Sequence, residues 1–228
     1  MGRRSDHTRA ELYELVLGAA RELAETDGLR GVNTRAIAGR IGYSPGTLYN
    51  HFANLDDLIV HLNARTLDEL YEACAGVAFE DGPEAALRAL ARRYIGFVSA
   101  HPNLWAAVLE HGLPGGADMP SWYGVKALKL LGLAEQAIAP LFPPGREAER
   151  AHSARVLWSG LYGIRALAGT GKQPRSESMT ALVDTLIEVY VKGLRAEAAP
   201  AAKARAGTRK RRSSTKVIAA GSARGRRS

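Results

Sequence analysis

Glycines, prolines and asparagines divide this chain into apolar segments with helical spacing, and that pattern most strongly limits the folds it can adopt. Breaks recur about every 15–25 residues, too far apart for a meander of short strands. The first segment ends at Asp27-Gly28, which is typical of a helix C-terminus. It repeats apolar residues at the i, i+3, i+4, i+7 spacing of an amphipathic helix, at Leu12, Leu15, Val16, Ala19, Ala20 and Leu23. The sequence therefore predicts an all-α fold.

Two short helices are predicted next, over residues 34–41 and 45–51, with Gly42-Tyr43-Ser44 between them. Thr34 and Ser44 are the expected N-caps. Pro45 suits the first position of a helix, because the N–H that proline lacks would have no partner within the helix there. This length and turn chemistry are those of a helix-turn-helix. Such pairs also occur in protein cores without any nucleic-acid role, so spacing alone leaves both interpretations open.

In a DNA-binding helix-turn-helix, the N-terminal end of the second helix enters the major groove. Gly46 would keep this end narrow, so that the backbone can approach DNA, and Thr47 and Asn50 would face outward beside it. Hydroxyl groups and helix N-termini suit phosphates, and an asparagine can bind adenine with two hydrogen bonds. The side chains expected to pack beneath the first helix are Ile37, Ile41, Leu48 and Phe52.

The net charge of +8 belongs to the end of the chain. Residues 203–228 contain ten basic and no acidic residues, which leaves 21 basic and 23 acidic residues, a net charge of −2, elsewhere. Residues 1–65 hold eight of each sign, whereas DNA-binding faces are usually basic. The placement of the arginines still favours DNA, because they lie on an expected N-terminal arm and on the motif, at Arg3, Arg4, Arg9, Arg35 and Arg40.

The segment NTRAIAGRIGYSPGTLYNHFANLDDLI, residues 33–59, closely resembles the DNA-binding signature of the TetR family of transcriptional regulators. The shared features include the Gly-Tyr-Ser turn, Gly-Thr-Leu-Tyr, His-Phe and an acidic start to the next helix. At Leu55 the chain departs from the family, which often has a phosphate-binding lysine there, so that contact is not expected. The resemblance implies DNA contacts by Thr34, Arg35, Ser44, Gly46, Thr47, Tyr49, Asn50 and His51.

The same resemblance implies a DNA-binding domain of three helices over residues 8–65, with the motif at 33–52, and a helical ligand-binding and dimerisation domain over residues 66–196. This second domain should hold about five to six helices. Beyond the helix that continues toward Cys74, helices are expected at 83–100, 102–110, 120–139, 146–168 and 177–196. The last two carry wide apolar stripes, and Gly160 and Gly163 suggest close helix approach. These stripes fit either a four-helix dimer interface or an intramolecular core.

Most of the large aromatic residues lie in this second half. Aromatic side chains line ligand pockets, although they fill cores more often. A small-molecule effector is implied by the family resemblance, and the candidate contacts are Tyr94, Trp105, Trp122, Tyr123, Trp158 and Tyr162.

The tail, residues 197–228, is rich in alanine, glycine, serine, lysine and arginine and contains no aromatic residue. A segment of this composition cannot bury enough apolar surface to offset the entropy of ordering, so disorder is predicted. One interpretation is a solvated extension. The other is a nonspecific clamp on DNA, for which Arg224-Gly225-Arg226 is a weak sign, because the prolines that flank a minor-groove hook are missing.

Enzyme signatures are lacking: no phosphate-binding glycine loop, Gly-x-Ser-x-Gly elbow or His-Glu-x-x-His pair is present. No cofactor, metal site or membrane association is expected. The single cysteine fits a reducing cytoplasm, and the expected location within it is the nucleoid. The predicted function is a ligand-responsive homodimeric repressor that binds a palindromic operator in double-stranded DNA. The alternatives are an architectural DNA-binding protein acting mainly through its tail and, third, a helical ligand carrier or enzyme.

Overall fold

The computed structural model describes residues 7–169 and 178–197, and over these ranges the regular secondary structure is entirely helical, which confirms the predicted all-α class. The predicted disorder of the tail concerns residues outside this description. The α-helices are α1 (Arg9–Asp27), α2 (Thr34–Ile41), α3 (Pro45–Leu48), α4 (Leu55–Ala75), α5 (Pro83–Ala100), α6 (Pro102–Glu110), α7 (Ser121–Ile138), α8 (Glu147–Gly169) and a helix over residues 179–197, here named the C-terminal helix. Short 3-10 helices lie at Leu29–Gly31, Pro114–Gly116 and Ala139–Leu141.

The chain divides into two compact units. The first unit comprises Met1–Ala78 and Ala89–Ala134, and the second comprises Phe79–Arg88 and Glu135–Ser228. The predicted domain boundary after Arg65 falls inside α4, which is continuous across it. The division into a DNA-binding and a ligand-binding part therefore stays a prediction about function.

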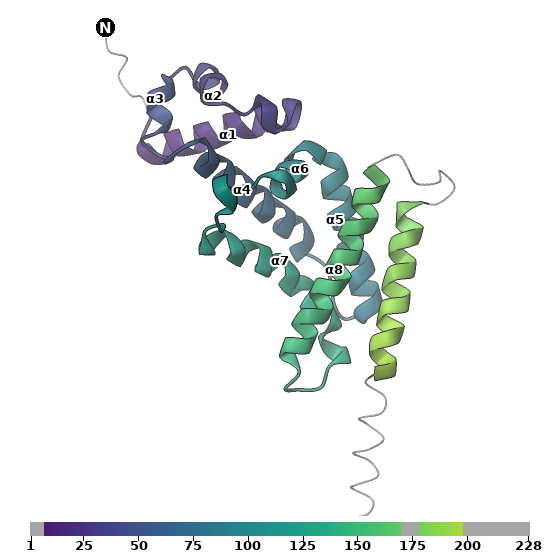
Figure 1. Ribbon diagram of the computed structural model, residues 1–228. Coiled ribbons are helices and arrows are strands. Elements are labelled where there is room, and N and C mark those ends of the chain that lie inside the picture. Colours follow the sequence, from purple (N-terminus) through teal and green to yellow (C-terminus); the bar gives the residue numbers. More distant parts are fainter. Residues whose placement is uncertain (1–6, 170–177, 198–228) are drawn as a thin grey trace, which may run out of the picture. The chain divides into compact units, whose positions relative to one another are not determined.

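The core of the first unit lies against α1, with α2 and α3 on one side of that helix (Figure 1). The apolar stripe predicted for α1 is buried except for Leu15, which is 37% exposed, and Leu23, which is partly buried. The four residues expected beneath α1 all pack there: three are fully buried and Ile41 is partly buried. The buried members of this core include Leu12, Val16, Ala19, Ala20, Ile37, Leu48, Phe52, Leu58 and Leu62.

Local hydrogen bonds explain where α1 and α2 begin and end. Thr8 and Glu11 form a reciprocal capping box at the start of α1, and the hydrogen bond from the Thr8 backbone lowers the pKa of Glu11. α1 and α2 end at Gly28 and Gly42, whose φ angles of 67° and 76° favour glycine. The predicted N-cap of α2 was wrong by one residue: Asn33 caps the helix, with its Oδ1 accepting from Ala36 N at 2.9 Å.

Within the first unit, α6 is tied to both α1 and α4. His101 Nδ1 lies 2.7 Å from Glu25 Oε1 at the end of α1. The buried Asn63 of α4 donates through Nδ2 to the Ala107 carbonyl of α6 at 3.0 Å. These contacts place the helix that follows the motif in one packed body with α6.

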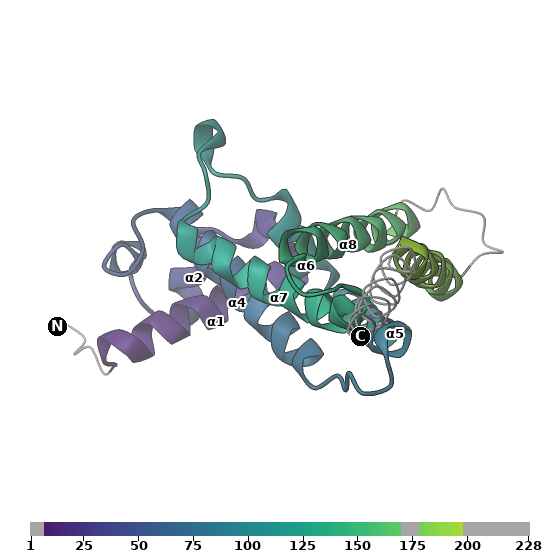
Figure 2. The same ribbon diagram turned by 90° about the horizontal axis from the view of Figure 1, so that it is seen from below.

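In the second unit, α8 and the C-terminal helix lie side by side, in Figure 1 and again in Figure 2. They are antiparallel, because Ser153 accepts from Tyr190 Oη at 2.9 Å while the later Gly160 faces the earlier Leu186. A Cβ on Gly160 would lie 3.0 Å from Leu186 Cδ2, which confirms the expected close approach there. At Gly163 an added Cβ would meet nothing within 4 Å, so that glycine has no such role inside the protomer.

Candidate nucleic-acid interface

The second helix of the motif begins where the sequence predicts and ends earlier. Ser44 occupies the N-cap position, but its Oγ lies 3.1 Å from Thr47 Oγ1 and makes no hydrogen bond to a backbone N–H of the first turn. Pro45 begins α3, which ends at Leu48 rather than at His51. The backbone then continues in turns, with His51 N donating to the Leu48 carbonyl at 3.0 Å.

Two buried side chains hold this short helix to the rest of the unit. Leu48 is 1% exposed and Phe52 is 2% exposed. The Phe52 ring stacks on Tyr13 of α1, with centroids 5.3 Å apart, and meets His61 of α4 edge-on at 5.6 Å. Burial raises the pKa of the Tyr13 hydroxyl, which lies 3.0 Å from His61 Nδ1. The anchor therefore connects α3 to both long helices.

The opposite face of the motif is open. Gly46 and Asn50 are exposed, and the Tyr49 side chain is 54% exposed. A Cβ added to Gly46 would meet only Ser44 Oγ, at 3.8 Å. Packing within the protein therefore does not require a glycine at this position.

The other predicted contacts vary in accessibility. Arg35 is exposed on the first turn of α2, beside the half-buried Thr34. Thr47 is also half-buried. His51 is half-buried too, with its ring centroid 6.4 Å from that of Tyr13 and 6.3 Å from that of Phe52. Part of the His51 ring therefore belongs to the anchor of α3.

Contacts between the start of α1 and the motif were not predicted from the sequence. His7 Nδ1 lies 2.7 Å from the hydroxyl of Tyr43 in the turn. Arg9, which was expected on an arm, is instead the first residue of α1, and its Nη2 donates to the Asn50 carbonyl at 3.3 Å. The spacing of residues along the sequence does not indicate contacts between positions so far apart. Tyr43 is, however, part of the predicted Gly-Tyr-Ser turn. The other arm residues, Arg3 and Arg4, lie outside the described part of the chain.

Leu55, at the position where the chain departs from the family pattern, packs against other apolar side chains. Leu55 is partly buried against the core of the first unit. The preceding Asn54 caps α4 as predicted, with its Oδ1 accepting from Asp57 N at 2.8 Å. A leucine here therefore contributes to the core where a lysine would reach toward solvent.

Of the six aromatic residues predicted as ligand contacts, four lie in the first unit and two in the second. Tyr94, Trp105 and Tyr123 are buried in the first unit, and the Tyr94 and Trp105 rings pack edge-to-face at 5.5 Å. Trp122, also in the first unit, is 38% exposed and stacks on His61 with centroids 4.8 Å apart. Trp158 and Tyr162 lie on α8 in the second unit.

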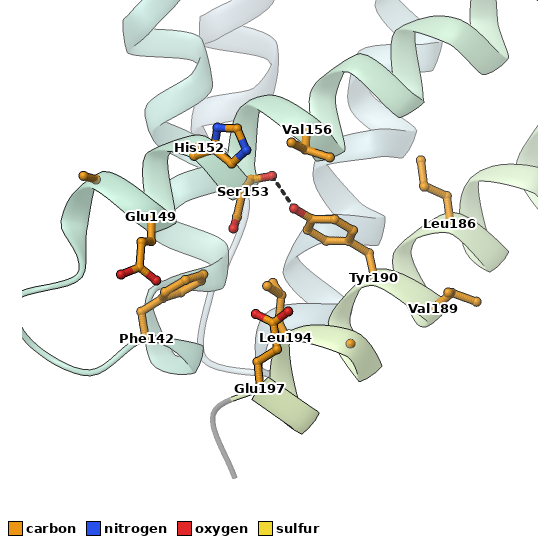
Figure 3. A pocket seen from close by; sticks show the side chains of 12 residues that line it. Phe142, Glu149, His152, Ser153, Val156, Leu186, Val189, Tyr190, Leu194 and Glu197 are labelled. Carbon is orange, nitrogen blue, oxygen red and sulfur yellow. Dashed lines mark hydrogen bonds between the residues drawn. The ribbon is translucent and has the colours of Figure 1, made fainter. Parts of the chain in front are cut away.

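Two of the grooves lined by described residues bear on these candidates. The smaller, of about 340 Å³, lies in the first unit and includes Trp122. The larger, of about 640 Å³, lies in the second unit between α8 and the C-terminal helix (Figure 3). The larger groove contains none of the six aromatic residues; its lining is Phe142, Ala148, Glu149, His152, Ser153, Val156, Leu186, Val189, Tyr190, Gly193, Leu194 and Glu197.

A short helix anchored by buried side chains, with an exposed glycine and polar groups at its start, has the geometry of a helix-turn-helix DNA-binding protein. Comparison with known proteins agrees. A family model described as "Bacterial regulatory proteins, tetR family" matches residues 16–62. A second, described as "Tetracyclin repressor-like, C-terminal domain", matches residues 87–190. The chain belongs to the TetR family of transcriptional regulators.

Individual relatives are similar along most of the chain. The HTH-type transcriptional regulator YobS of Bacillus subtilis is 26% identical over 181 residues, which cover 79% of this chain and 91% of YobS. A solved structure of a protein of unknown function from Rhodococcus has a TM-score of 0.67 at 23% identity, covering 85% of this chain and all of that one. A transcriptional regulator described as a TetR from Streptomyces coelicolor has a TM-score of 0.61 at 22% identity, covering 83% and 98%. The two structures support the fold.

Family membership makes the chain a DNA-binding transcriptional regulator and not an enzyme. Among residues 7–169 and 178–197, no helix is long and apolar enough to cross a membrane. The same residues contain no group of three or more histidine, cysteine or acidic side chains placed to hold a metal ion. Cys74 is buried in α4, and burial raises the pKa of its thiol to about 11.

Proposed function

We propose that the chain is a ligand-responsive homodimeric repressor that binds a palindromic operator in the DNA of the nucleoid. Residues 8–65 would bind DNA, and residues 66–196 would bind the effector and form the dimer. One observation carries the DNA half of this proposal: an exposed Gly46, which packing does not require, lies on a helix that is held in place by the buried Leu48 at its end and the buried Phe52 just after it. A dimer of this kind would bind two half-sites about one DNA turn, roughly 34 Å, apart.

The DNA contacts would come from both helices of the motif. The start of α3 would enter the major groove, and the first turn of α2 would lie along the phosphates. The Asn50 side chain is exposed while its own carbonyl is held by Arg9, which supports a role in base or phosphate binding. The full proposed set is Thr34, Arg35, Ser44, Gly46, Thr47, Tyr49, Asn50 and His51.

Gly46→Ala tests the docking of α3. The added Cβ fits the protomer, and alanine favours a helix by up to about 1 kcal/mol over glycine, so thermal stability should hold or rise. Operator affinity should fall about tenfold or more, because an obstructed contact with DNA costs about 1–3 kcal/mol. Fluorescence anisotropy with an operator duplex selected from genomic fragments measures the loss, and Thr47→Ala should show a loss of similar size.

Gly132→Ala in α7 is the matched control, because a Cβ there meets nothing within 4 Å and one on Gly46 meets only Ser44 Oγ, at 3.8 Å. It should leave operator affinity unchanged. Wild-type affinity in Gly46→Ala would rule out the proposed approach of α3 to DNA, provided that the operator itself is bound selectively by the wild type.

The dimer would form through the exposed faces of α8 and the C-terminal helix. Both carry large apolar side chains in solvent: Val156 is 44%, Leu167 is 55% and Val189 is 63% exposed. Val156 and Val189 line the open groove seen in Figure 3, and the space beside Gly163 would admit a helix at close range. A second copy of the chain is the proposed occupant, because two helices from each protomer would bury these residues together as a four-helix interface.

The effector response is proposed for the smaller groove, in the first unit, where Asp68, Trp122 and Lys126 of the effector-binding part line one cavity together with residues of the DNA-binding part. Trp122 of α7 stacks on His61 there, and the His61 ring in turn supports Phe52, the anchor of α3. A ligand that displaced Trp122 would therefore disturb the packing of His61 and Phe52, which holds the DNA-binding helix in place. Such a ligand switches DNA binding only as far as it prefers one arrangement over the other.

Trp122→Ala tests this location. A compound that releases the wild-type protein from its operator should lose that effect on the variant, because its contact surface is gone. Tyr162→Ala is the control, since Tyr162 has the same 38% exposure and is not among the residues that line the groove. Release of Trp122→Ala at the wild-type concentration of compound would place the effector elsewhere; anisotropy at increasing concentrations of compound gives both curves.

The architectural alternative stays open because the tail alone carries ten basic residues. A protein of that kind would bind unrelated duplexes as tightly as any genomic fragment. Selective retention of particular fragments by the purified protein favours the repressor.

A further inference from the structure

The smaller groove combines an accessible aromatic surface with charged side chains from α1, α4 and α7. The Trp122 ring lies nearly flat against the His61 ring, with centroids 4.8 Å apart and planes inclined by 24°. At about 340 Å³ the groove is near the lower limit for small-molecule sites, so its size suits a compound of one or two rings. The charged residues that line it are Glu14, Arg65, Asp68 and Lys126.

These four charges form two ion pairs, and in each pair the carboxylate is the more exposed partner. Arg65 Nη1 lies 2.8 Å from Glu14 Oε2, with the side chains 40% and 62% exposed. Lys126 Nζ lies 2.5 Å from Asp68 Oδ2, with the side chains 30% and 49% exposed. Exposed ion pairs contribute little net stability, because water solvates the separated charges well. Each pair therefore opens most easily when its carboxylate turns outward into water.

The two cations would remain in the groove when the pairs open. Arg65 keeps a second partner in Glu69, whose Oε1 lies 3.6 Å from Arg65 Nε, and Glu69 is itself held by Arg21 of α1. Lys126 is the least exposed of the four charges that line the groove. A cation that is poorly exposed to water gains more from a new anionic partner than a well-solvated one does. The opened groove would therefore favour an anion.

We propose that this groove binds a small planar aromatic acid. The ring of the acid would enter beside His61 in contact with Trp122, and its carboxylate would replace the two protein carboxylates as the partner of Arg65 and Lys126. The inference rests on the proposed function, since it names the chemical class of effector for the groove to which that function assigns the response. Binding would open the ion pairs that join α4 to α1 and α7 through the groove, and it would disturb the stacking on His61 at the same time.

The same geometry disfavours other charges on the ring. A cationic ring would have to displace the two less exposed partners, and a neutral ring offers nothing to replace either carboxylate. Isothermal titration calorimetry of the full-length protein without DNA tests this order with 2-naphthoate, 2-naphthamide and 2-naphthylmethylammonium. The carboxylate should bind about tenfold or more tightly than the amide or the ammonium compound, because charge-assisted hydrogen bonds are the stronger kind.

Lys126→Gln should weaken the binding of 2-naphthoate about tenfold and leave the binding of 2-naphthamide unchanged. Asp68→Asn should have the opposite effect on 2-naphthoate, because it removes the carboxylate that competes for Lys126. Lys129→Gln is the matched control: this lysine is on the same helix, lies 3.8 Å from the centroid of the Tyr71 ring and does not line the groove. It should keep the wild-type affinity.

Three results would overturn the proposal. They are no binding of 2-naphthoate, equal affinity for 2-naphthoate and its amide, and an equal loss of 2-naphthoate affinity in Lys126→Gln and Lys129→Gln. Failure of the proposed function looks different, because the calorimetry is done without DNA. Selective binding of 2-naphthoate that never releases the operator would support the aromatic-acid site and overturn its role in regulation.

Discussion

Phe52→Ala is expected to lower the free energy of unfolding by about 3–5 kcal/mol, the range for deleting a buried aromatic ring. The ring is 2% exposed, stacks on Tyr13 and meets His61 edge-on, so its loss leaves a cavity between α1 and α4. Because the free energy of unfolding of an ordinary domain is only about 5–15 kcal/mol, the packing that holds α3 in place would be severely weakened. Urea denaturation followed by circular dichroism measures the change, and operator binding should be lost with it.

Tyr49→Ala provides the comparison, because this aromatic residue lies three positions earlier and is 54% exposed. A surface substitution of this kind usually changes stability by less than about 0.5 kcal/mol. Operator affinity should nevertheless fall, and it should fall in part for Tyr49→Phe, which removes only the hydroxyl group. If Phe52→Ala lowered the free energy of unfolding by less than about 1 kcal/mol, the proposal that Phe52 holds α3 to the core would be refuted, whatever the effect on DNA binding.

The helices could be predicted closely because their ends depend on local chemistry. Gly28 and Gly42 have positive φ angles that few other residues tolerate, and Pro83 and Pro102 each begin a helix as expected. Where two capping residues stood side by side, spacing could not choose between them, and Asn33 rather than Thr34 caps α2. Local signals also did not show that α3 would end after Leu48.

The side-chain partners could not be predicted, since they join residues far apart in the chain. Nothing in the sequence pairs Arg21 with Glu69, 48 positions away, yet that ion pair joins α1 to α4. Residue type was equally uninformative for the aromatic set. Trp105 is in the core and Trp122 is in a groove, although both lie on helices predicted in the same half of the sequence.

Val189→Asp should convert the dimer into a monomer. Val189 is 63% exposed in the protomer, so a carboxylate there leaves the fold intact. In the proposed interface it would be buried without a partner, at a cost of several kcal/mol, and symmetry places one in each protomer. Sedimentation velocity should show a monomer at concentrations where the wild type is a dimer. Operator affinity should fall about 100-fold or more, since two linked contacts bind far more tightly than one.

Val125→Asp on α7 separates this interface from the exposed apolar face of α7, because Val125 is also 63% exposed and also lies on a helix. It should remain dimeric with wild-type operator affinity. A monomeric Val125→Asp beside a dimeric Val189→Asp would move the interface to α7, where Leu128 and Trp122 continue the exposed apolar stripe. The two variants add the same charge at the same exposure, so a difference between them can arise only from what the second protomer covers.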